Sequence, residues 1–325
     1  MRLRRSVYDP SRISQRGVAA VSTWEQAICI PPIPNTTELA PLEMVTLAQQ
    51  RQFAWLIAII FFAGSVLGFV DRAVLGIVLP QVRKDLSLSN TQYSLAINGF
   101  LIMYLIFYVL GGRTADMLGS RRTFSLLIMF WSLASMAHAF TRGIASLCLF
   151  RALLGIGEGG FYPTAMKGIT GWFPTENRAK AIGLLICGVS LGMLLTPPVV
   201  AWVTLHHGWR MAFLVTGSAG FFLIPPWLWL HRCIKEAYGT RDPAPAHIRG
   251  PNSLSTEGMT LGQAFTKRKY WLFLLARAFP DAVTFYLFWL PGYFQDTRHY
   301  DLEKVGKLLW IPFSALVSEP WEERG

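Results

Sequence analysis

Seven stretches of mainly apolar residues, each about 20 residues long or longer, determine what this chain can fold into. A helix of about 20 apolar residues crosses the hydrocarbon core of a membrane. Only 15% of the residues are charged, against about 25% in soluble domains. We therefore predict an all-α integral membrane protein rather than a soluble, disordered or disulfide-rich chain. The stretches are residues 53–80, 92–112, 123–141, 144–167, 179–205, 209–231 and 270–294.

The spacing of these stretches divides the chain into four predicted regions. Residues 1–52 are polar, lack the apolar core of a signal peptide and are expected to be disordered. The first six stretches form a transmembrane bundle at 53–231, and the proline-containing segment 232–269 forms a central loop. Residues 270–325 hold a seventh helix and the start of an eighth near Lys304, so the chain is expected to be C-terminally incomplete.

The distribution of basic residues predicts how the chain is oriented. The formal net charge is +11, and with the N-terminus inside, most basic residues fall on that side. An excess of Lys and Arg is typical of cytoplasmic loops. We therefore expect a multi-pass protein of the inner (plasma) membrane with its N-terminus and central loop in the cytoplasm. In this context the charge indicates orientation and not a nucleic-acid partner.

Four ionisable residues lie inside the first and fourth predicted spans, where charge is expensive. Asp71 and Arg72 are in the first span, and Arg151 and Glu158 are in the fourth. At about 2.5–3.5 kcal/mol for each charge at a helix centre, leaving all four unpaired would cost roughly 10–14 kcal/mol. They must therefore face a water-filled cavity or one another. The alternative to a functional site is an internal ion pair that holds the helices together.

Helix geometry determines on which face of its helix each of these charged residues lies. Arg151 and Glu158 are seven residues apart, which puts them on one helix face, about 10.5 Å apart along the axis. Asp71 and Arg72 are adjacent, so their side chains leave a regular helix about 100° apart and must point in different directions. Arginine suits a carboxylate ligand through two parallel hydrogen bonds, while a buried carboxyl group can act as a proton switch. The combination predicts a site for an organic anion.

Two glycine patterns have simpler explanations than cofactor binding. Residues 155–160 match the dinucleotide fingerprint G-x-G-x-x-G, but the flanking residues are membrane helix and not a strand. Close helix packing explains this run better, as it does Gly188 and Gly192. Pro197 and Pro198 follow and are expected to bend or break the helix. No metal-ligand spacing and no nucleophile–base pair is visible, so neither a cofactor nor an enzyme is predicted.

Several motifs resemble those of the major facilitator superfamily. Residues 112–122 resemble its loop between helices two and three, and the helix-five glycines and prolines resemble its antiporter-type motif. Asp71-Arg72 with Arg151, Glu158 and Pro163 is similar to the anion:cation symporter branch. Residues 285–291 and 310–313 are similar to the hexuronate transporters (glucuronate and galacturonate). The resemblance covers residues 53–313 and implies a six-helix N-terminal bundle followed by the first one to two helices of a C-terminal bundle.

The resemblance also implies roles for individual residues. Arg72, Tyr104 and Arg151 would bind the substrate, and Arg151 would also be the charge partner of the protonation sites Asp71 and Glu158. The alternative role for Tyr104 is packing. The alternative role for the basic residues of the loop at 112–122 is to anchor the chain at the membrane surface. A cytoplasmic latch between helices would consist of Gly112, Asp116, Gly119, Arg121 and Arg122.

The function implied by the resemblance is secondary active transport. A hexuronate or related sugar-acid monoanion would move with protons by alternating access, through a monomer in the lipid bilayer. Two alternatives remain open at this point. The chain could be a non-transporting remnant or sensor, or it could belong to a carrier of another carboxylate such as an aldonate or an aromatic acid.

Overall fold

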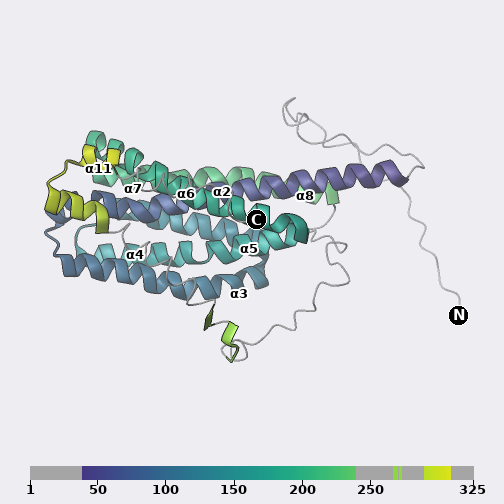
Figure 1. Ribbon diagram of the computed structural model, residues 1–325, viewed down its shortest axis with the longest axis horizontal. Helices are drawn as coiled ribbons and strands as arrows, with labels where there is room; N and C mark the ends of the chain where they lie inside the picture. Colours follow the sequence, from purple (N-terminus) through teal and green to yellow (C-terminus); the bar gives the residue numbers. More distant parts are fainter. Residues whose placement is uncertain (1–38, 239–265, 270, 273–288, 309–325) are drawn as a thin grey trace, which may run out of the picture. The chain divides into compact units, whose positions relative to one another are not determined.

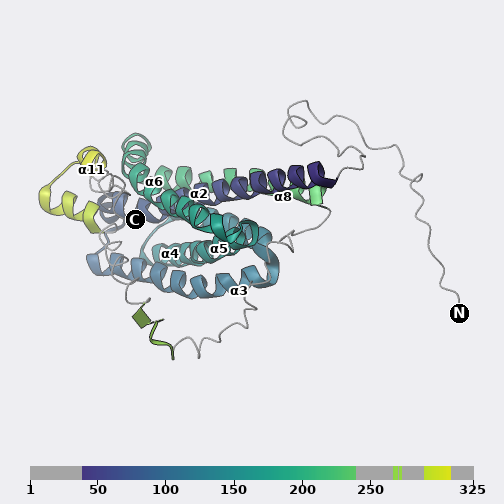
Figure 2. The same cartoon turned by 45° about the vertical axis from the view of Figure 1, so that its right-hand side comes forward.

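The computed structural model describes residues 39–238, 266–269, 271–272 and 289–308, and it has no β-strand in those ranges. Residues 1–44 and residues 45–325 form two compact units, and the description below concerns the second unit and the helix that leads into it. In that unit α3 runs beside α4 in both views (Figure 1, Figure 2). The elements are α2 (Leu39–Leu86), α3 (Asn90–Ala137), η2 (His138–Phe140), α4 (Ile144–Gly159), α5 (Phe161–Trp172), α6 (Thr175–His207), α7 (Trp209–Ala219), η3 (Gly220–Leu223), α8 (Ile224–Tyr238) and α11 (Leu302–Leu308), with a further helical segment at 289–298.

Five helical stretches of the described residues are long and apolar enough to cross a membrane, and one of them contains two crossings. That stretch, Asn90–Phe140, has 51 residues, far more than the about 20 that one crossing needs. Gly119 interrupts it with φ 79°, a left-handed conformation that glycine adopts without steric cost. The Thr123 hydroxyl then donates to the Thr114 carbonyl at 3.2 Å, which two residues nine apart in a straight helix could not do. The chain thus reverses near Gly119, in agreement with the two predicted spans 92–112 and 123–141.

The first helix begins earlier than the apolar pattern predicted. It starts at Leu39, so residues 39–52, expected to belong to a disordered extension, are helical. This segment is rich in Leu, Ala, Glu, Gln and Met, which favour helix, and its one proline, Pro41, lies in the first turn, where proline is tolerated. An apolar stretch therefore shows which part of a helix can enter lipid, but it does not show at which residue the helix begins. Residues 1–38 lie outside the described ranges.

The sixth span likewise continues beyond its apolar part. The predicted end was residue 231, but α8 continues to Tyr238. Arg232 and Glu236 form an exposed i,i+4 ion pair at 3.1 Å on this extension, and such pairs support the helix where it leaves the membrane. The central loop thus begins later than 232, and its residues 239–265 lie outside the described ranges.

Helix α6 passes through its two prolines without a break. Pro197 and Pro198 were expected to bend or break this span, and α6 does not break there, since it is one helix from Thr175 to His207. Membrane helices tolerate proline because neighbouring helices and side chains compensate for the lost backbone hydrogen bonds. Helix α11 packs here, since a Cβ on its Gly306 would come within 2.7 Å of the Ala201 Cβ.

Glycines set the close approach of α4 to α3. A Cβ added to Gly155 or Gly159 would collide with the carbonyl oxygens of Phe100 and Tyr104, and one added to Gly157 would lie 2.6 Å from the Trp131 Cβ. These glycines therefore bring two helices into backbone contact, as expected, and this contact accounts for the fingerprint-like run.

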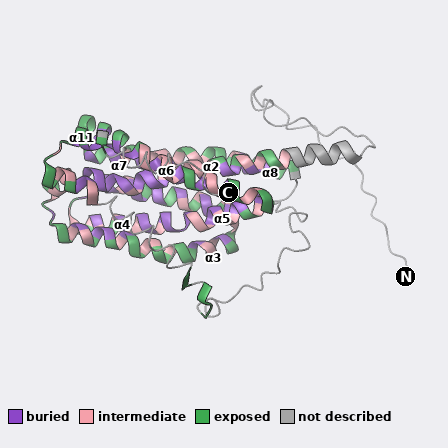
Figure 3. Cartoon of the chain, viewed as in Figure 1, coloured by how far each residue is buried: buried purple, intermediate pink, exposed green. Residues whose placement is uncertain are grey.

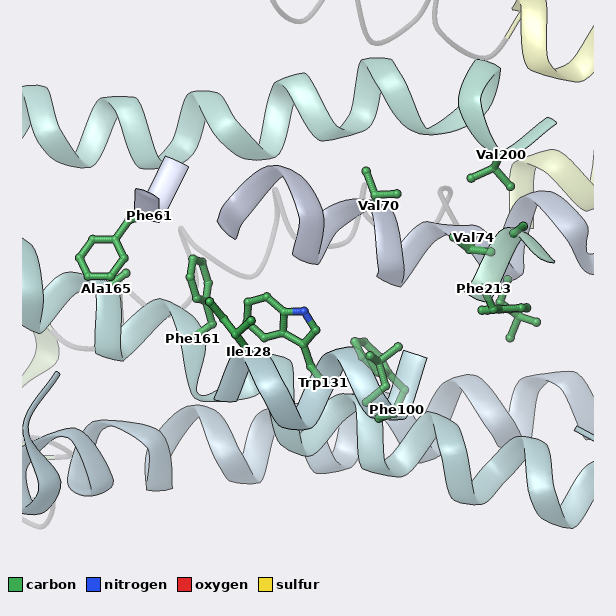
Figure 4. Close-up of a cluster of buried hydrophobic side chains, with 14 of the residues drawn as sticks. Phe61, Val70, Val74, Phe100, Ile128, Trp131, Phe161, Ala165, Val200 and Phe213 are labelled. Carbon is green, nitrogen blue, oxygen red and sulfur yellow. The ribbon is translucent and has the colours of Figure 1, made fainter. Parts of the chain in front are cut away.

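Aromatic side chains pack against one another in the core of the bundle. Phe61 of α2 contacts Phe124 of α3 at 5.1 Å between ring centroids, and Trp227 of α8 contacts Phe124 at 4.3 Å. Trp131 meets Phe161 edge-on at 5.4 Å (Figure 4). Residues buried inside the bundle alternate with exposed ones along each helix (Figure 3), and many exposed residues are themselves large and apolar. A surface of this kind suits lipid better than water.

The segments after the central loop are described only in part. Residues 273–288, most of the predicted seventh span, lie outside the described ranges. Its end, the helical segment 289–298, contacts the end of α2, because Arg83 pairs with Asp296 at 2.7 Å. Trp289 also meets Tyr93 of α3 edge-on at 5.1 Å.

Candidate functional site

The four intramembrane charges predicted from the sequence meet where α2 crosses α4. Arg72 of α2 donates from Nε to Oε2 of Glu158 at 3.1 Å, and its Nη2 lies 3.0 Å from the same oxygen. The Glu158 side chain is 2% exposed and that of Arg72 is 24% exposed. Arg72 is therefore the accessible member of a pair whose carboxylate is enclosed.

Asp71 points away from this pair, as its position next to Arg72 requires. Its carboxylate accepts a hydrogen bond at 2.8 Å from the hydroxyl of Ser135, which lies in the part of α3 after Gly119. Asp71 and Ser135 are both fully buried, and the second carboxylate oxygen of Asp71 has no hydrogen-bond partner among the described residues. Two adjacent residues thus direct their charges to two different helices.

Arg151 hydrogen-bonds to neither of the two carboxyl groups. Its Nη1 donates to the main-chain carbonyl of Arg72 at 3.3 Å, while Nε and Nη2 have no partner in the described ranges. The whole side chain is buried, and Asp71 and Glu158 both act on it electrostatically. Removing one member of a buried charge set leaves an uncompensated charge, which costs about 3–5 kcal/mol. With Arg151, the four ionisable residues are two positive and two negative groups, so their formal charges cancel.

Tyr104 packs against Arg72, the most exposed of these four charged residues. The Arg72 Cζ lies 4.6 Å from the centre of the Tyr104 ring and 5.6 Å from that of Phe100, distances typical of a cation–π contact. An aromatic face attracts the guanidinium without using its hydrogen-bond donors. Tyr104 thus contacts the face of the Arg72 guanidinium, while the Nε and Nη2 donors are directed to Glu158.

The predicted latch residues gather around the reversal at Gly119, in the middle of α3. Asp116 pairs with Lys167 of α5 at 2.7 Å, and the same ammonium donates to the Ala115 carbonyl at 2.8 Å. The Arg121 carbonyl accepts from the Trp227 indole at 3.0 Å, but the side chains of Arg121 and Arg122 form no ion pair with the described residues. Gly112 approaches Pro163 of α5, since a Cβ added to this glycine would lie 3.8 Å from the proline Cβ.

Two residues of these sites were not anticipated from the sequence. Lys167, the last residue of the predicted fourth span, was not linked to Asp116. Ser135, the partner of Asp71, lies in an apolar span where Ser132 and Ser135 form a small polar face. A pair of serines three residues apart in such a span is the signal that could have identified it.

Residues 60–318 match the sequence profile of the Major Facilitator Superfamily. The chain belongs to this superfamily. It is 26% identical over 265 residues to a hexuronate transporter of Escherichia coli (strain K12), covering 79% of this chain and 61% of that protein. It is 33% identical over 260 residues to a hexuronate transporter of Bacillus subtilis (strain 168), covering 79% and 60%.

Solved structures of transporters share the fold. The crystal structure of a bacterial homologue of the human lysosomal transporter Spinster, inward-facing and unoccupied, matches with a TM-score of 0.62 at 23% identity, covering 79% of this chain and 58% of that one. The chain thus forms a partial major facilitator bundle and is a multi-pass membrane protein. It spans about 60% of the length of the hexuronate transporters that it matches. Membership of this superfamily, and not any absence of catalytic groups, separates the chain from enzymes.

Proposed function

We propose that this major facilitator chain carries the anion site of a proton-coupled symporter for a sugar-acid monoanion, a hexuronate. The relatives named hexuronate transporters support the substrate class. The Arg72–Glu158 ion pair supports the coupling, and it is the observation on which the proposal depends. Transport itself is proposed for a whole carrier, in which two halves rock around a central site by alternating access.

The coupling follows from competition for one guanidinium. Glu158 occupies two donors of Arg72, Nε and Nη2, through a single oxygen. A substrate carboxylate that binds arginine through two parallel hydrogen bonds needs an adjacent pair of donors, and both adjacent pairs of Arg72 include Nη2. Protonation of Glu158 weakens its hold on Arg72 and leaves the site with one net positive charge, which favours an anion. A proton and the substrate therefore bind together, and each is released more easily without the other.

Asp71 and Arg151 form a second, enclosed part of the proposed coupling system. Protonation of Asp71 would remove one of the negative charges near Arg151. The Arg151 guanidinium would then interact more strongly with the Glu158 carboxylate. With two protons for each monoanion, the cargo carries one net positive charge. The membrane potential drives such a charge inward with about 2.3 kcal/mol per 100 mV.

The proposed carrier acts as a monomer in the inner membrane. Its N-terminus and central loop face the cytoplasm, which the excess of basic residues in these segments supports. Asp116 and Lys167 lie at this cytoplasmic end, with Gly112, Gly119, Arg121 and Arg122 close to them in sequence. We assign these residues to a latch that holds the inner ends of the helices until substrate binds.

Binding of D-glucuronate to the purified 325-residue chain in detergent micelles tests the proposal. Wild-type affinity is expected to rise as the pH falls, because Glu158 must take up a proton before it releases Arg72. The Glu158→Gln variant should bind at every pH with little dependence on pH. Glu236→Gln, which alters an exposed glutamate of α8, is the matched control and should behave as the wild type.

Three outcomes are informative. No binding of D-glucuronate by the wild type at any pH would overturn the anion site. Binding with an unchanged pH profile in Glu158→Gln would remove this residue from the coupling role. Restored binding and proton-driven uptake in a longer carrier that contains these residues would support symport over a sensor that binds without transport.

A further inference from the structure

Three tyrosines continue from Arg72 along the bundle, and the proposed function uses only the first. Tyr104 and Tyr108 are one turn apart on α3, with 6.2 Å between their ring centroids. Tyr108 stacks on Tyr162 of α5, with centroids 6.1 Å apart and an interplanar angle of 16°. We call these three residues the tyrosine ladder. It joins two helices and begins directly at the cation, 4.6 Å from the Arg72 Cζ.

The ladder is more accessible than the aromatic packing residues of the core. Tyr108 is 40% exposed, while Tyr104 and Tyr162 are partly exposed; the adjacent Phe100 is 1% exposed. Packing alone therefore does not explain why three tyrosines follow one another here. Each is at least partly exposed and carries a polar hydroxyl on its ring.

The ladder shares its surroundings with a charged group, and this argues against a lipid-facing role. Arg72 is 24% exposed, and its guanidinium lies over the Tyr104 ring. An arginine that opened into hydrocarbon would cost about 2.5–3.5 kcal/mol. Tyr104 and the ring that follows it therefore border a polar space, in which a ligand held by Arg72 would extend.

We propose that the tyrosine ladder is a ring subsite, where the pyranose ring of a sugar acid lies against aromatic faces while its carboxylate is held by Arg72. A sugar ring has an apolar face of C–H groups and a rim of hydroxyls. Tyrosine complements both, because its ring contacts the C–H face and its hydroxyl exchanges hydrogen bonds with the rim. The ring of a hexuronate lies directly beyond its carboxylate, and Tyr108 lies one helical turn beyond Tyr104.

This inference rests on the proposed function and adds a second source of specificity to it. Arg72 recognises any carboxylate, whereas the ladder distinguishes a ring-bearing acid from a short one. Stacking on the ladder thus contributes affinity only for substrates that are long enough to reach Tyr108.

The test is isothermal titration of the purified chain in micelles with three probes: D-glucuronate, glycolate and D-glucose. Glycolate has the carboxylate without the ring, and D-glucose has the ring without the carboxylate. Tyr108→Leu and Tyr162→Leu are each expected to weaken D-glucuronate binding about tenfold, while glycolate affinity stays within about twofold. Tyr108→Phe should retain most of the D-glucuronate affinity, because it keeps the aromatic face.

Tyr293→Leu is the matched control, since Tyr293 is a 47% exposed tyrosine outside the ladder. Normal glycolate binding by a variant shows that it is folded with an intact anion site. If one leucine variant does not fold, the other of Tyr108→Leu and Tyr162→Leu gives the same comparison.

The outcomes separate the ladder from the anion site. Equal losses for D-glucuronate and glycolate, or no loss for either, would overturn the ring subsite. If Arg72→Gln abolishes binding of both acids while Tyr108→Leu changes neither, the proposed function stands without the ladder. If the wild type binds neither acid, the proposed function fails and the ladder assignment falls with it.

Discussion

The Arg72 guanidinium of α2 and the Glu158 carboxylate of α4 meet at 3.0 Å, although the two residues are 86 positions apart in the chain. This pair joins two helices within the membrane and uses donors that a substrate carboxylate would also need. It therefore links the stability of the bundle to its proposed capacity to bind an anion.

Replacing Arg72 by lysine keeps the charge and removes the planar pair of donors. Arg72→Lys is expected to weaken D-glucuronate binding tenfold or more, because an ammonium cannot form two parallel hydrogen bonds with one carboxylate. Titration calorimetry measures the loss. Arg83→Lys alters an arginine that pairs with Asp296 outside the site, so an equal loss in both variants would contradict the assignment.

Removing the hydroxyl of Ser135 should destabilise the chain. Ser135→Ala deletes the hydrogen bond to the buried Asp71 carboxylate and is expected to lower the free energy of unfolding by about 1–3 kcal/mol. Denaturant titration in mixed micelles measures this change. Ser132 is equally buried on the same helix but its hydroxyl has no partner in the described ranges, so Ser132→Ala should cost clearly less. Equal losses would show that Asp71 does not depend on Ser135.

The contact between α3 and α4 should not tolerate a methyl group at Gly155. Gly155→Ala places a Cβ against the Phe100 carbonyl, and the overpacking is expected to cost about 1–3 kcal/mol of unfolding free energy. At Gly183 of α6 an added Cβ meets nothing within 4 Å. Gly183→Ala should therefore be neutral or stabilise by up to about 1 kcal/mol, the difference in helix propensity. A neutral Gly155→Ala would show that the two helices can separate at little cost.

The Asp116–Lys167 pair is exposed and should contribute little to stability. A double-mutant cycle with Asp116→Asn and Lys167→Gln is expected to give a coupling energy below about 1 kcal/mol, as is usual for surface ion pairs. A much larger value would indicate a structural tie instead of a latch that opens readily.

Much of this architecture could be predicted from the sequence, because length, hydropathy and helical period act locally. The apolar stretches located the membrane helices, and the 100° step per residue required Asp71 and Arg72 to diverge. Glycine spacing in 155–160 correctly indicated helix packing. The helix ends were less predictable, since α2 begins at Leu39 and α8 ends at Tyr238, where helix propensity continues past the apolar part.

Which arginine pairs with which carboxylate could not be predicted from such local rules. Four ionisable residues at similar depth allow several pairings, and a rotation of one helix by a fraction of a turn exchanges the partners. The sequence therefore indicated that charges would meet, but not that Glu158 would take Arg72 while Arg151 remained with two unpartnered donors among the described residues. Asp116 with Lys167 is a similar case, because the two residues lie on helices whose relative rotation depends on packing.

Proton uptake on substrate binding tests the central claim most directly. Calorimetric titration of the chain with D-glucuronate near neutral pH, in two buffers of different ionisation enthalpy, gives the number of protons bound with each anion. If Glu158 and the substrate carboxylate compete for Arg72, the wild type takes up protons on binding. Glu158→Gln then binds D-glucuronate with clearly reduced proton uptake, whereas Glu236→Gln matches the wild type. Undiminished proton uptake in Glu158→Gln would contradict the account.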